Sequence, residues 1–460
     1  METIYLKLIP CIIISYIFLS VNIKLLPRCY TIRFISGYYT FQFVFLLIYL
    51  SIYPDSKIWN TDFPNLYMAD YLDNAILAYL LFQSGVLIAS LAGKFVFPKY
   101  RNRIEFTEYI KENHKKLVIP LIFGGLVIFL YPIALSIPVI GFVISSLFNF
   151  MNLVPFVAGI LFFHNKGLRY FWFFCLLTLF SIGILTGGRG IALLSIILYL
   201  LGFYYSLVSK RSKRLVLVSG IFLSIPFISF IAFVGIFRNI VGRVSLEEIN
   251  FERAIQVYNK YEKIKDSKII DLNNDEAKIQ GWGRFVNFVN FTEFATVPSQ
   301  RSHLGFDGFF NVDLPYAFDI SFISGSTVED RLINNANGFR LNDYGYYVTL
   351  SSSVEYSIVT ESYIRFGYLG ILLFSIIISF FSIGLEYTLY ISNKKRPVLE
   401  IFCMALLFYQ AILSYAYPIF IIIRNMFIAI IWAYLIVSFT YLIKILFWKK
   451  STNHTPKNYT

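Results

Sequence analysis

The sequence predicts an all-α polytopic membrane protein with about eleven transmembrane helices and one large, partly helical outer loop. Three observations predict this class. Hydrophobic residues make up 57% of the 460-residue chain and charged residues only 15%, a balance that would leave a soluble protein with large exposed apolar patches. Long apolar runs recur along the chain, and a single long polar stretch, residues 238–355, interrupts them. Lys and Arg gather in short clusters between the apolar runs, as they do in cytoplasmic membrane loops.

Each predicted helix rests on a run long enough to cross a bilayer, which takes roughly 20 predominantly apolar residues. The stretch from Leu117 to His164 can also be divided differently around Ile137-Pro138. The last two helices are divided at Pro418, because proline lacks the helical N–H. The predicted helices lie near residues 4–22, 34–53, 74–97, 117–136, 140–163, 169–186, 190–208, 215–237, 364–390, 398–416 and 419–447.

Charge predicts the topology. Basic clusters follow the first, third, fifth, seventh, ninth and last helices, so all of them fall on one side, the cytoplasm. The polar stretch holds sixteen Asp and Glu against twelve Lys and Arg, whereas the rest of the chain holds eleven against twenty-eight. The N-terminus is therefore predicted outside and the C-terminus in the cytoplasm. The predicted divisions are helices one to eight in 1–237, the outer loop in 238–355, helices nine to eleven in 356–450 and a cytoplasmic tail in 451–460.

Several function classes are disfavoured by the same sequence. The net charge of +13 is spread over the loop clusters rather than gathered on one nucleic-acid-binding surface, so no nucleic-acid partner is predicted. No Gly-rich P-loop, HExxH or kinase signature occurs, and no Cys/His spacing suits a metal. We therefore predict neither a metal nor a cofactor. A cleavable signal peptide is not expected, and no disulfide is expected in the outer loop, since the cysteines are Cys11, Cys29, Cys175 and Cys403.

The first candidate for chemistry is the turn Thr186-Gly187-Gly188-Arg189-Gly190 at an outer helix end. Glycines let the backbone approach a ligand closely, and the free N–H groups of the following helix, together with Arg189, suit an oxyanion such as a pyrophosphate. A tight turn with an interfacial arginine explains the same residues equally well.

Further arginines are expected near the same membrane level. Arg238 and Arg243 lie where the chain leaves the membrane, although snorkelling of long side chains at the surface is an equal alternative. Arg424 lies about five residues inside an apolar run, where an ionisable group usually faces a polar cavity. Other arginines of the loop are candidates for a basic cavity wall: Arg284, Arg331 and Arg340.

Two candidates for proton transfer lie on the outer side. Glu361 and Arg365 stand four residues apart where the chain returns to the membrane, so a local helical ion pair is as good an explanation as catalysis. His303 is the histidine predicted outside, and a lone loop histidine is most often just solvated. Imidazole nevertheless titrates near neutral pH, which keeps His303 as a candidate base.

These pieces together resemble the bacterial O-antigen polymerases, the Wzy-type oligosaccharide repeat-unit polymerases. The resemblance rests on the Thr186–Gly190 turn, the dominant outer loop and the run Glu361-Ser362-Tyr363-Ile364-Arg365-Phe366-Gly367. It implies a metal-independent glycosyl transfer at the outer face of the inner membrane. The growing glycan on undecaprenyl pyrophosphate is the donor, and a lipid-linked repeat unit is the acceptor.

The resemblance also implies roles for the candidates. Leaving pyrophosphate would be stabilised by arginine without a metal. The implied partners are the lipid-linked oligosaccharide, the bilayer and a chain-length-regulating co-polymerase. Arg189, Arg238 and Arg424 are expected on the pyrophosphate, Glu361 or His303 as the base, and the other substrate-binding residues are Gly187, Gly188, Arg243, Arg284, Arg340, Arg365 and Tyr363.

Three alternatives remain open. An O-antigen ligase uses the same donor with lipid A–core as acceptor, and His303 favours it. A flippase or transporter is a non-enzymatic alternative, although the long loop and the lack of internal repeats count against it. A glycosyltransferase with acids in its first outer loop is the third, and the residues concerned are Asp55, Asp62, Asp70 and Asp73.

Overall fold

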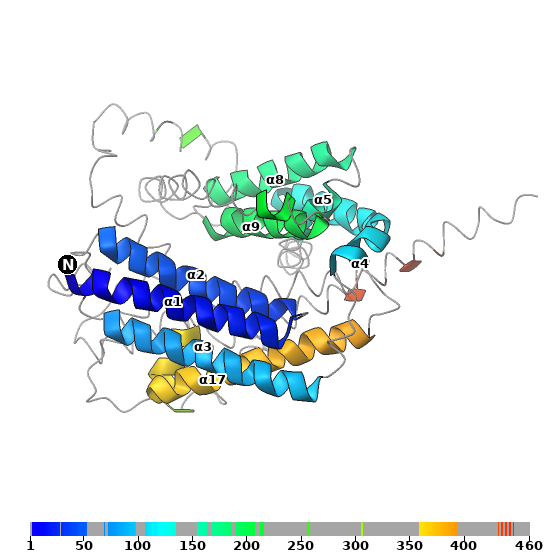
Figure 1. The fold of residues 1–460 in the computed structure, drawn as a ribbon. Coiled ribbons are helices and arrows are strands. Elements are labelled where there is room, and N and C mark those ends of the chain that lie inside the picture. The colour runs from blue at the N-terminus through cyan, green and yellow to red at the C-terminus, as the bar shows by residue number, and fades with distance from the viewer. Residues whose placement is uncertain are drawn as a thin grey trace, which may run out of the picture. The chain divides into compact units, whose positions relative to one another are not determined.

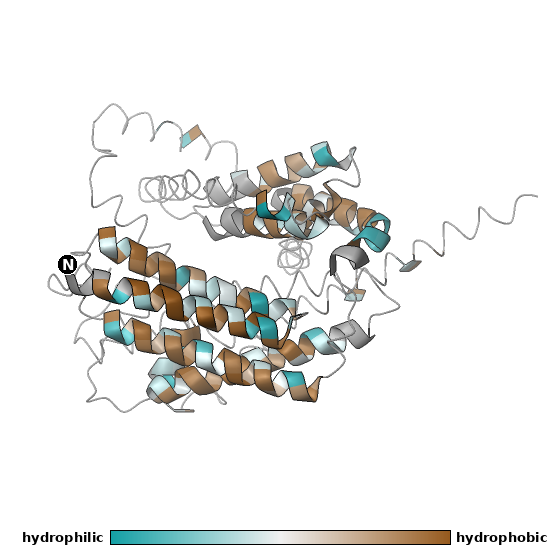
Figure 2. Ribbon diagram, in the orientation of Figure 1, coloured by the Kyte–Doolittle hydropathy of each residue, from teal (hydrophilic) through white to brown (hydrophobic). Residues whose placement is uncertain are grey.

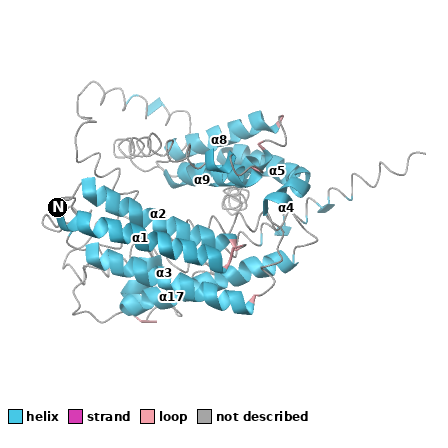
Figure 3. Ribbon diagram, in the orientation of Figure 1, coloured by secondary structure: helices cyan, strands magenta, loops and turns pink. Residues whose placement is uncertain are grey.

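The part of the chain that can be described is helical. The computed structural model describes residues 2–27, 29–52, 69, 72–97, 106–134, 154–162, 167–185, 189–207, 212–215, 305–306 and 358–392, with isolated positions at 255, 256 and 259 and between 431 and 445. No strand occurs among these residues (Figure 3). Four helical stretches among them are long and apolar enough to cross a membrane, namely Tyr30–Ile52, Leu72–Val96, Ile110–Leu130 and Arg365–Thr388. This composition is consistent with a helical membrane protein.

Eight of the predicted helices overlap described ones, and for the predicted helix 140–163 the described part is Val154–Leu161. Most of their turns are hydrophobic, with hydrophilic turns mainly toward the ends (Figure 2). The predicted helices 215–237, 398–416 and 419–447 lie outside the described residues, apart from Leu215 and the isolated positions after 431. The coincident helices are α1 (Glu2–Leu25), α2 (Tyr30–Ile52), α3 (Leu72–Val96), α5 (Val118–Ala134), α7 (Val154–Leu161), α8 (Leu168–Leu185), α9 (Arg189–Ser206) and α17 (Ile358–Ser392).

The structure differs from the prediction at two places. A short helix, α4 (Phe106–Asn113), and a 3-10 turn, η3 (His114–Leu117), precede α5. This segment is rich in charge, so a search for apolar runs passes over it, yet Ile110 and Leu117 are buried. Helix α17 begins at Ile358, ahead of the predicted start at residue 364, because its first turns are polar but still helical.

The described helices belong to two compact units. The first unit holds α1, α2, α3 and α17 as far as Tyr387, and the second holds α4, η3, α5, α7, α8 and α9. In the second unit, α7 and α9 touch backbone to backbone where Gly159 meets Gly202. Arg169 of α8 lies over the ring of Phe162, with 4.7 Å from its guanidinium carbon to the ring centroid.

Two contacts fix the directions of the helices in the first unit. Lys7 near the start of α1 pairs with Asp73 at the start of α3, with Nζ and Oδ1 2.6 Å apart. Helices α1 and α3 therefore both begin at this end and run the same way, and α2 runs back beside α1 in the opposite direction (Figure 1). At the opposite end, Glu386 of α17 reaches the start of α2. We name these the Lys7 end and the Glu386 end of the unit.

Helix α17 packs against α3 through small residues. A Cβ added to Gly85 would lie 1.7 Å from Oγ of Ser375, and one added to Gly93 would lie 3.1 Å from Ile383. Both contacts advance by eight residues in each helix, so α3 and α17 run parallel, and Ala89 lies fully buried between the two glycines. Small residues at every fourth position let helix backbones approach closely within a membrane.

Candidate functional site

The candidate site forms where α17 folds back on itself. Gly367 has φ 63° and ψ −151°, and the preceding Phe366 has φ −139° and ψ 15°, so the helix breaks between two arms. A residue with a side chain adopts the conformation of Gly367 only with strain. The short arm, 358–365, lies against the long arm, since a Cβ on Gly370 would lie 2.2 Å from the carbonyl oxygen of Ser362. We call this pair of arms the α17 hairpin.

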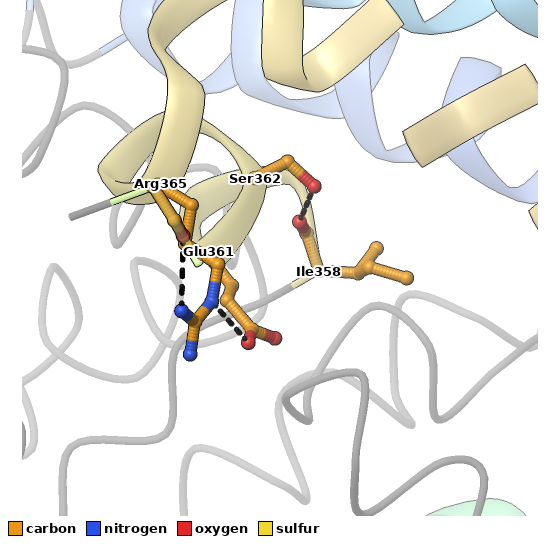
Figure 4. A network of polar contacts seen from close by, with 5 residues as sticks. Ile358, Glu361, Ser362 and Arg365 are labelled. Carbon is orange, nitrogen blue, oxygen red and sulfur yellow. Dashed lines mark hydrogen bonds and ion pairs between the residues drawn. The ribbon is translucent and has the colours of Figure 1, made fainter. Parts of the chain in front are cut away.

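A buried ion pair lies on the short arm. Nε of Arg365 donates to Oε1 of Glu361 at 3.1 Å, and the two side chains are 7% and 4% exposed. This is the i,i+4 helical ion pair that the sequence analysis gave as an alternative to a catalytic role. In Figure 4 both side chains extend from one stripe of the arm, next to the stripe of Ile358 and Ser362. A buried charge without a partner is costly, so this pairing is what allows both groups to lie here.

The long polar stretch reaches the same arm at Gly305. Gly305 N–H donates to the carbonyl oxygen of Arg365 at 2.7 Å, and Nη1 of Arg365 donates to the carbonyl oxygen of Gly305 at 3.3 Å. The next residue, Phe306, meets Phe366 edge to face with ring centroids 4.8 Å apart. Residues 60 positions apart are thus joined by two hydrogen bonds and an aromatic contact.

The other stripe of the short arm faces the bundle. Ile358, Val359 and Ser362 line a small apolar pocket that α2, α3 and the long arm close. Ile358 and Val359 are buried at 3% and 4% exposure, so the short arm is inserted into the first unit rather than laid on it. The residues that complete the pocket are Ile35, Tyr39, Phe82, Ile371, Phe374, Ser375 and Ile378.

Tyr363 lies on the short arm close to the turn. Its ring contacts that of Tyr368 across the turn, with centroids 5.1 Å apart. Burial raises the pKa of the Tyr363 phenol above its ordinary value. At neutral pH the group therefore stays protonated, which suits hydrogen bonding to a sugar or phosphate but not the role of a base.

A polar network inside the first unit was missed by the sequence reasoning. Oγ of Ser36 donates to Oε1 of Gln83 at 2.8 Å, and Nδ2 of Asn22 lies 3.2 Å from Ser36 and 3.4 Å from Gln83. Nε2 of Gln83 also donates to the hydroxyl of Thr40, and that hydroxyl is hydrogen-bonded to the hydroxyl of Tyr79 at 2.9 Å. Asn and Gln side chains within apolar runs indicate such a network, because polar side chains inside a membrane form hydrogen bonds with one another.

Glu386 is a second group that the sequence reasoning did not single out. It is fully buried and accepts hydrogen bonds from the backbone N–H groups of Tyr30 and Thr31, at 3.1 and 2.9 Å. The hydroxyl of Thr31 and the thiol of Cys29 donate to the same carboxylate. A negative charge at a helix N-terminus is stabilised by the exposed N–H groups and the helix dipole. Glu386 therefore joins α17 to α2.

The other predicted site residues are placed only in part. Arg189 begins α9 in the second unit, and its side chain is not among the described groups. Among the described residues, no three His, Cys, Asp or Glu side chains gather closely enough to hold a metal. The hairpin thus brings together Glu361, Tyr363 and Arg365. The predicted residues outside the described part are Gly187, Gly188, Arg238, Arg243, Arg284, His303, Arg331, Arg340 and Arg424.

Comparison with protein-family models, with curated proteins and with solved structures gave no match. Among the described residues, the α17 hairpin is where buried charge and the polar stretch meet.

Proposed function

We propose that the protein is a surface-polysaccharide polymerase of the bacterial inner membrane, of the O-antigen type. It would transfer the growing glycan from undecaprenyl pyrophosphate to a new lipid-linked repeat unit. The proposed topology has eleven spans, the N-terminus outside, the C-terminus in the cytoplasm and the loop 238–355 in the periplasm. Lys24, Arg33 and Lys94 all belong to the Glu386 end of the first unit, which supports placing that end in the cytoplasm.

One observation carries the proposal, namely the contact between Gly305 and the α17 hairpin. The motif that resembles the polymerases, Glu361 to Gly367, forms a buried polar site rather than a plain surface turn. The long polar stretch is bonded to that site through Gly305. A glycosyl transfer at a membrane surface needs such a place, where charged groups are held in low-dielectric surroundings beside a loop that can cover a sugar.

The reaction forms one bond and breaks another at the same carbon. An acceptor hydroxyl attacks C1 of the donor sugar, a new C1–O bond forms, and the C1–O bond to lipid pyrophosphate breaks. The hydroxyl proton passes to a base, for which Glu361 and His303 are the candidates. The pyrophosphate leaves with added negative charge, which Arg189, Arg238 and Arg424 are proposed to stabilise bidentately. Gly187 and Gly188 would let the backbone approach it, and Arg243, Arg284 and Arg340 would add positive charge.

The arginine assignment is tested by single alanine variants in a deletion strain. With Arg189→Ala, Arg238→Ala or Arg424→Ala we expect a loss of long surface glycan of at least about tenfold, since charge-assisted contacts made in the transition state are worth that much. The measurement is the length ladder of surface glycan on gels, normalised to inserted protein. Lys94→Ala, at the proposed cytoplasmic end, is the matched control. Unchanged ladders in all three variants would show that these arginines do not hold the pyrophosphate.

An O-antigen ligase is the second candidate, and one observation favours it. His303 lies two residues before the anchored Gly305, and a loop histidine is the feature that the ligase interpretation needs. The deletion strain separates the two functions. Loss of a polymerase leaves single repeat units on the surface, whereas loss of a ligase removes all surface glycan. Purified protein in lipid with synthetic lipid-linked repeat units separates either enzyme from a flippase, since only an enzyme lengthens the glycan.

A further inference from the structure

The guanidinium of Arg365 has two different partners on two different parts of the chain. Its Nε is bonded to the Glu361 carboxylate within the short arm, and its Nη1 is bonded to the Gly305 carbonyl oxygen from the polar stretch. The planar fork of arginine offers donors in several fixed directions, so one side chain can satisfy both partners at once. Glu361 balances the charge, and Nη1 donates to the loop.

The loop is also bonded to the backbone of the same residue. Gly305 N–H donates to the carbonyl oxygen of Arg365, and the ring of Phe306 packs on that of Phe366. The ring of Phe366 in turn packs on Phe374 of the long arm, with ring centroids 5.9 Å apart. The contact therefore has a reciprocal pair of hydrogen bonds and an aromatic connection to the long arm. Three interactions of different kinds on two consecutive loop residues indicate a built attachment point.

We infer that Arg365 is a positioning residue that anchors the Gly305-Phe306 segment of the polar stretch to the α17 hairpin. The anchor holds this segment against the arm that carries Glu361. The anchor itself is independent of the proposed function, whereas its importance for polymerisation rests on that function.

Cysteine cross-linking in membranes tests the anchor directly. The full chain carries Phe306→Cys and Phe366→Cys, with a protease site inserted after Gly345 so that only a cross-link keeps the two fragments together. A short bifunctional thiol reagent is expected to join them readily. Phe306→Cys with Leu373→Cys is the control pair, since Leu373 is 45% exposed and lies farther along the long arm than Phe366. Equal cross-linking of the two pairs would overturn the anchor.

Two substitutions then separate anchoring from folding. Arg365→Lys keeps a positive charge beside Glu361 but has a single donor group, so we expect near-normal thermal unfolding and cross-linking about three- to tenfold slower. Arg365→Ala is expected to lower both the unfolding temperature and the rate of cross-linking. Arg33→Lys, an equivalent change in α2, is expected to alter neither the unfolding temperature nor the rate of cross-linking. Cross-linking that stays at the unsubstituted rate in Arg365→Lys would show that the guanidinium does not hold the loop.

A glycan ladder recorded on the same variants distinguishes the two proposals. Slower cross-linking together with a shortened ladder in Arg365→Lys supports both the anchor and its importance for polymerisation. Slower cross-linking with a normal ladder keeps the anchor and overturns its importance for polymerisation. A normal rate of cross-linking overturns the anchor whatever the ladder shows.

Discussion

Helix α17 carries a buried glutamate near each of its ends, and the two are satisfied in different ways. Glu386 is fully buried, and its bonds to α2 come from neutral groups, two backbone N–H groups and a hydroxyl. Glu361 is 3% exposed and is bonded to a cation, Arg365, on its own helix. The first carboxylate joins two helices. The second belongs to a group that also holds a loop 60 residues away.

The difference shows that a charge inside an apolar segment need not signal chemistry. A helix N-terminus supplies donors and a favourable dipole, so the start of α2 stabilises the Glu386 carboxylate without any catalytic role. Glu361 differs in that its partner Arg365 also bonds to a residue outside the helix. The same distinction applies to Arg424, whose predicted role rests on depth in the membrane alone. A carboxylate or a helix C-terminus beside it would explain it structurally, as the start of α2 explains Glu386.

The largest effect is expected from removing one member of the buried ion pair. Glu361→Ala leaves Arg365 buried without its counter-ion, which typically costs about 3–5 kcal/mol of folding free energy. We expect a strongly lowered unfolding temperature of the purified protein in detergent. The double variant Glu361→Ala/Arg365→Ala should be more stable than Glu361→Ala alone, because no unpaired charge remains.

Glu361→Gln sharpens the comparison by removing the charge at nearly constant shape. The amide oxygen still accepts from Arg365, so the fold should persist while proton acceptance is lost. Surface glycan per inserted protein is expected to fall if Glu361 is the base. Full polymerisation by Glu361→Gln would exclude Glu361 from that role and leave His303.

A smaller effect is expected at the other end of α17. Glu386→Ala removes the acceptor for the first N–H groups of α2, a change we expect to cost roughly 2–3 kcal/mol from lost charged hydrogen bonds. Glu386→Gln should cost less, since one amide oxygen remains. Thermal unfolding measures both variants. The glycan ladder per folded protein should be unchanged, and a ladder lost at normal protein level would mean that Glu386 is not purely structural.

The sequence predicted most of what depends on local pattern. Apolar runs long enough for a membrane predicted the described helices of both units except α4 and η3, and the i,i+4 spacing offered the Glu361–Arg365 pair as one of two explanations. Gly367 was noted within the motif, but only its φ of 63° shows that the helix reverses there. Contacts between segments far apart in the chain could not be predicted, because no local sequence pattern indicates them. The bond from Gly305 to Arg365 and the bonds from Glu386 to α2 depend on how the helices pack.

The ion pair between Lys7 and Asp73 is exposed, unlike the contacts of Glu361 and Glu386, and it should contribute least to stability. Lys7 and Asp73 are 2.6 Å apart, but their side chains are 41% and 73% exposed. Exposed pairs contribute about 0–1 kcal/mol, because water screens the charges and both side chains lose freedom. Lys7→Ala is therefore expected to shift the unfolding temperature far less than Glu386→Ala, and less still at high salt. A shift as large as that of Glu386→Ala would mean that burial does not determine how much these three contacts contribute to stability, and the distinction between the two ends of α17 would lose its physical basis.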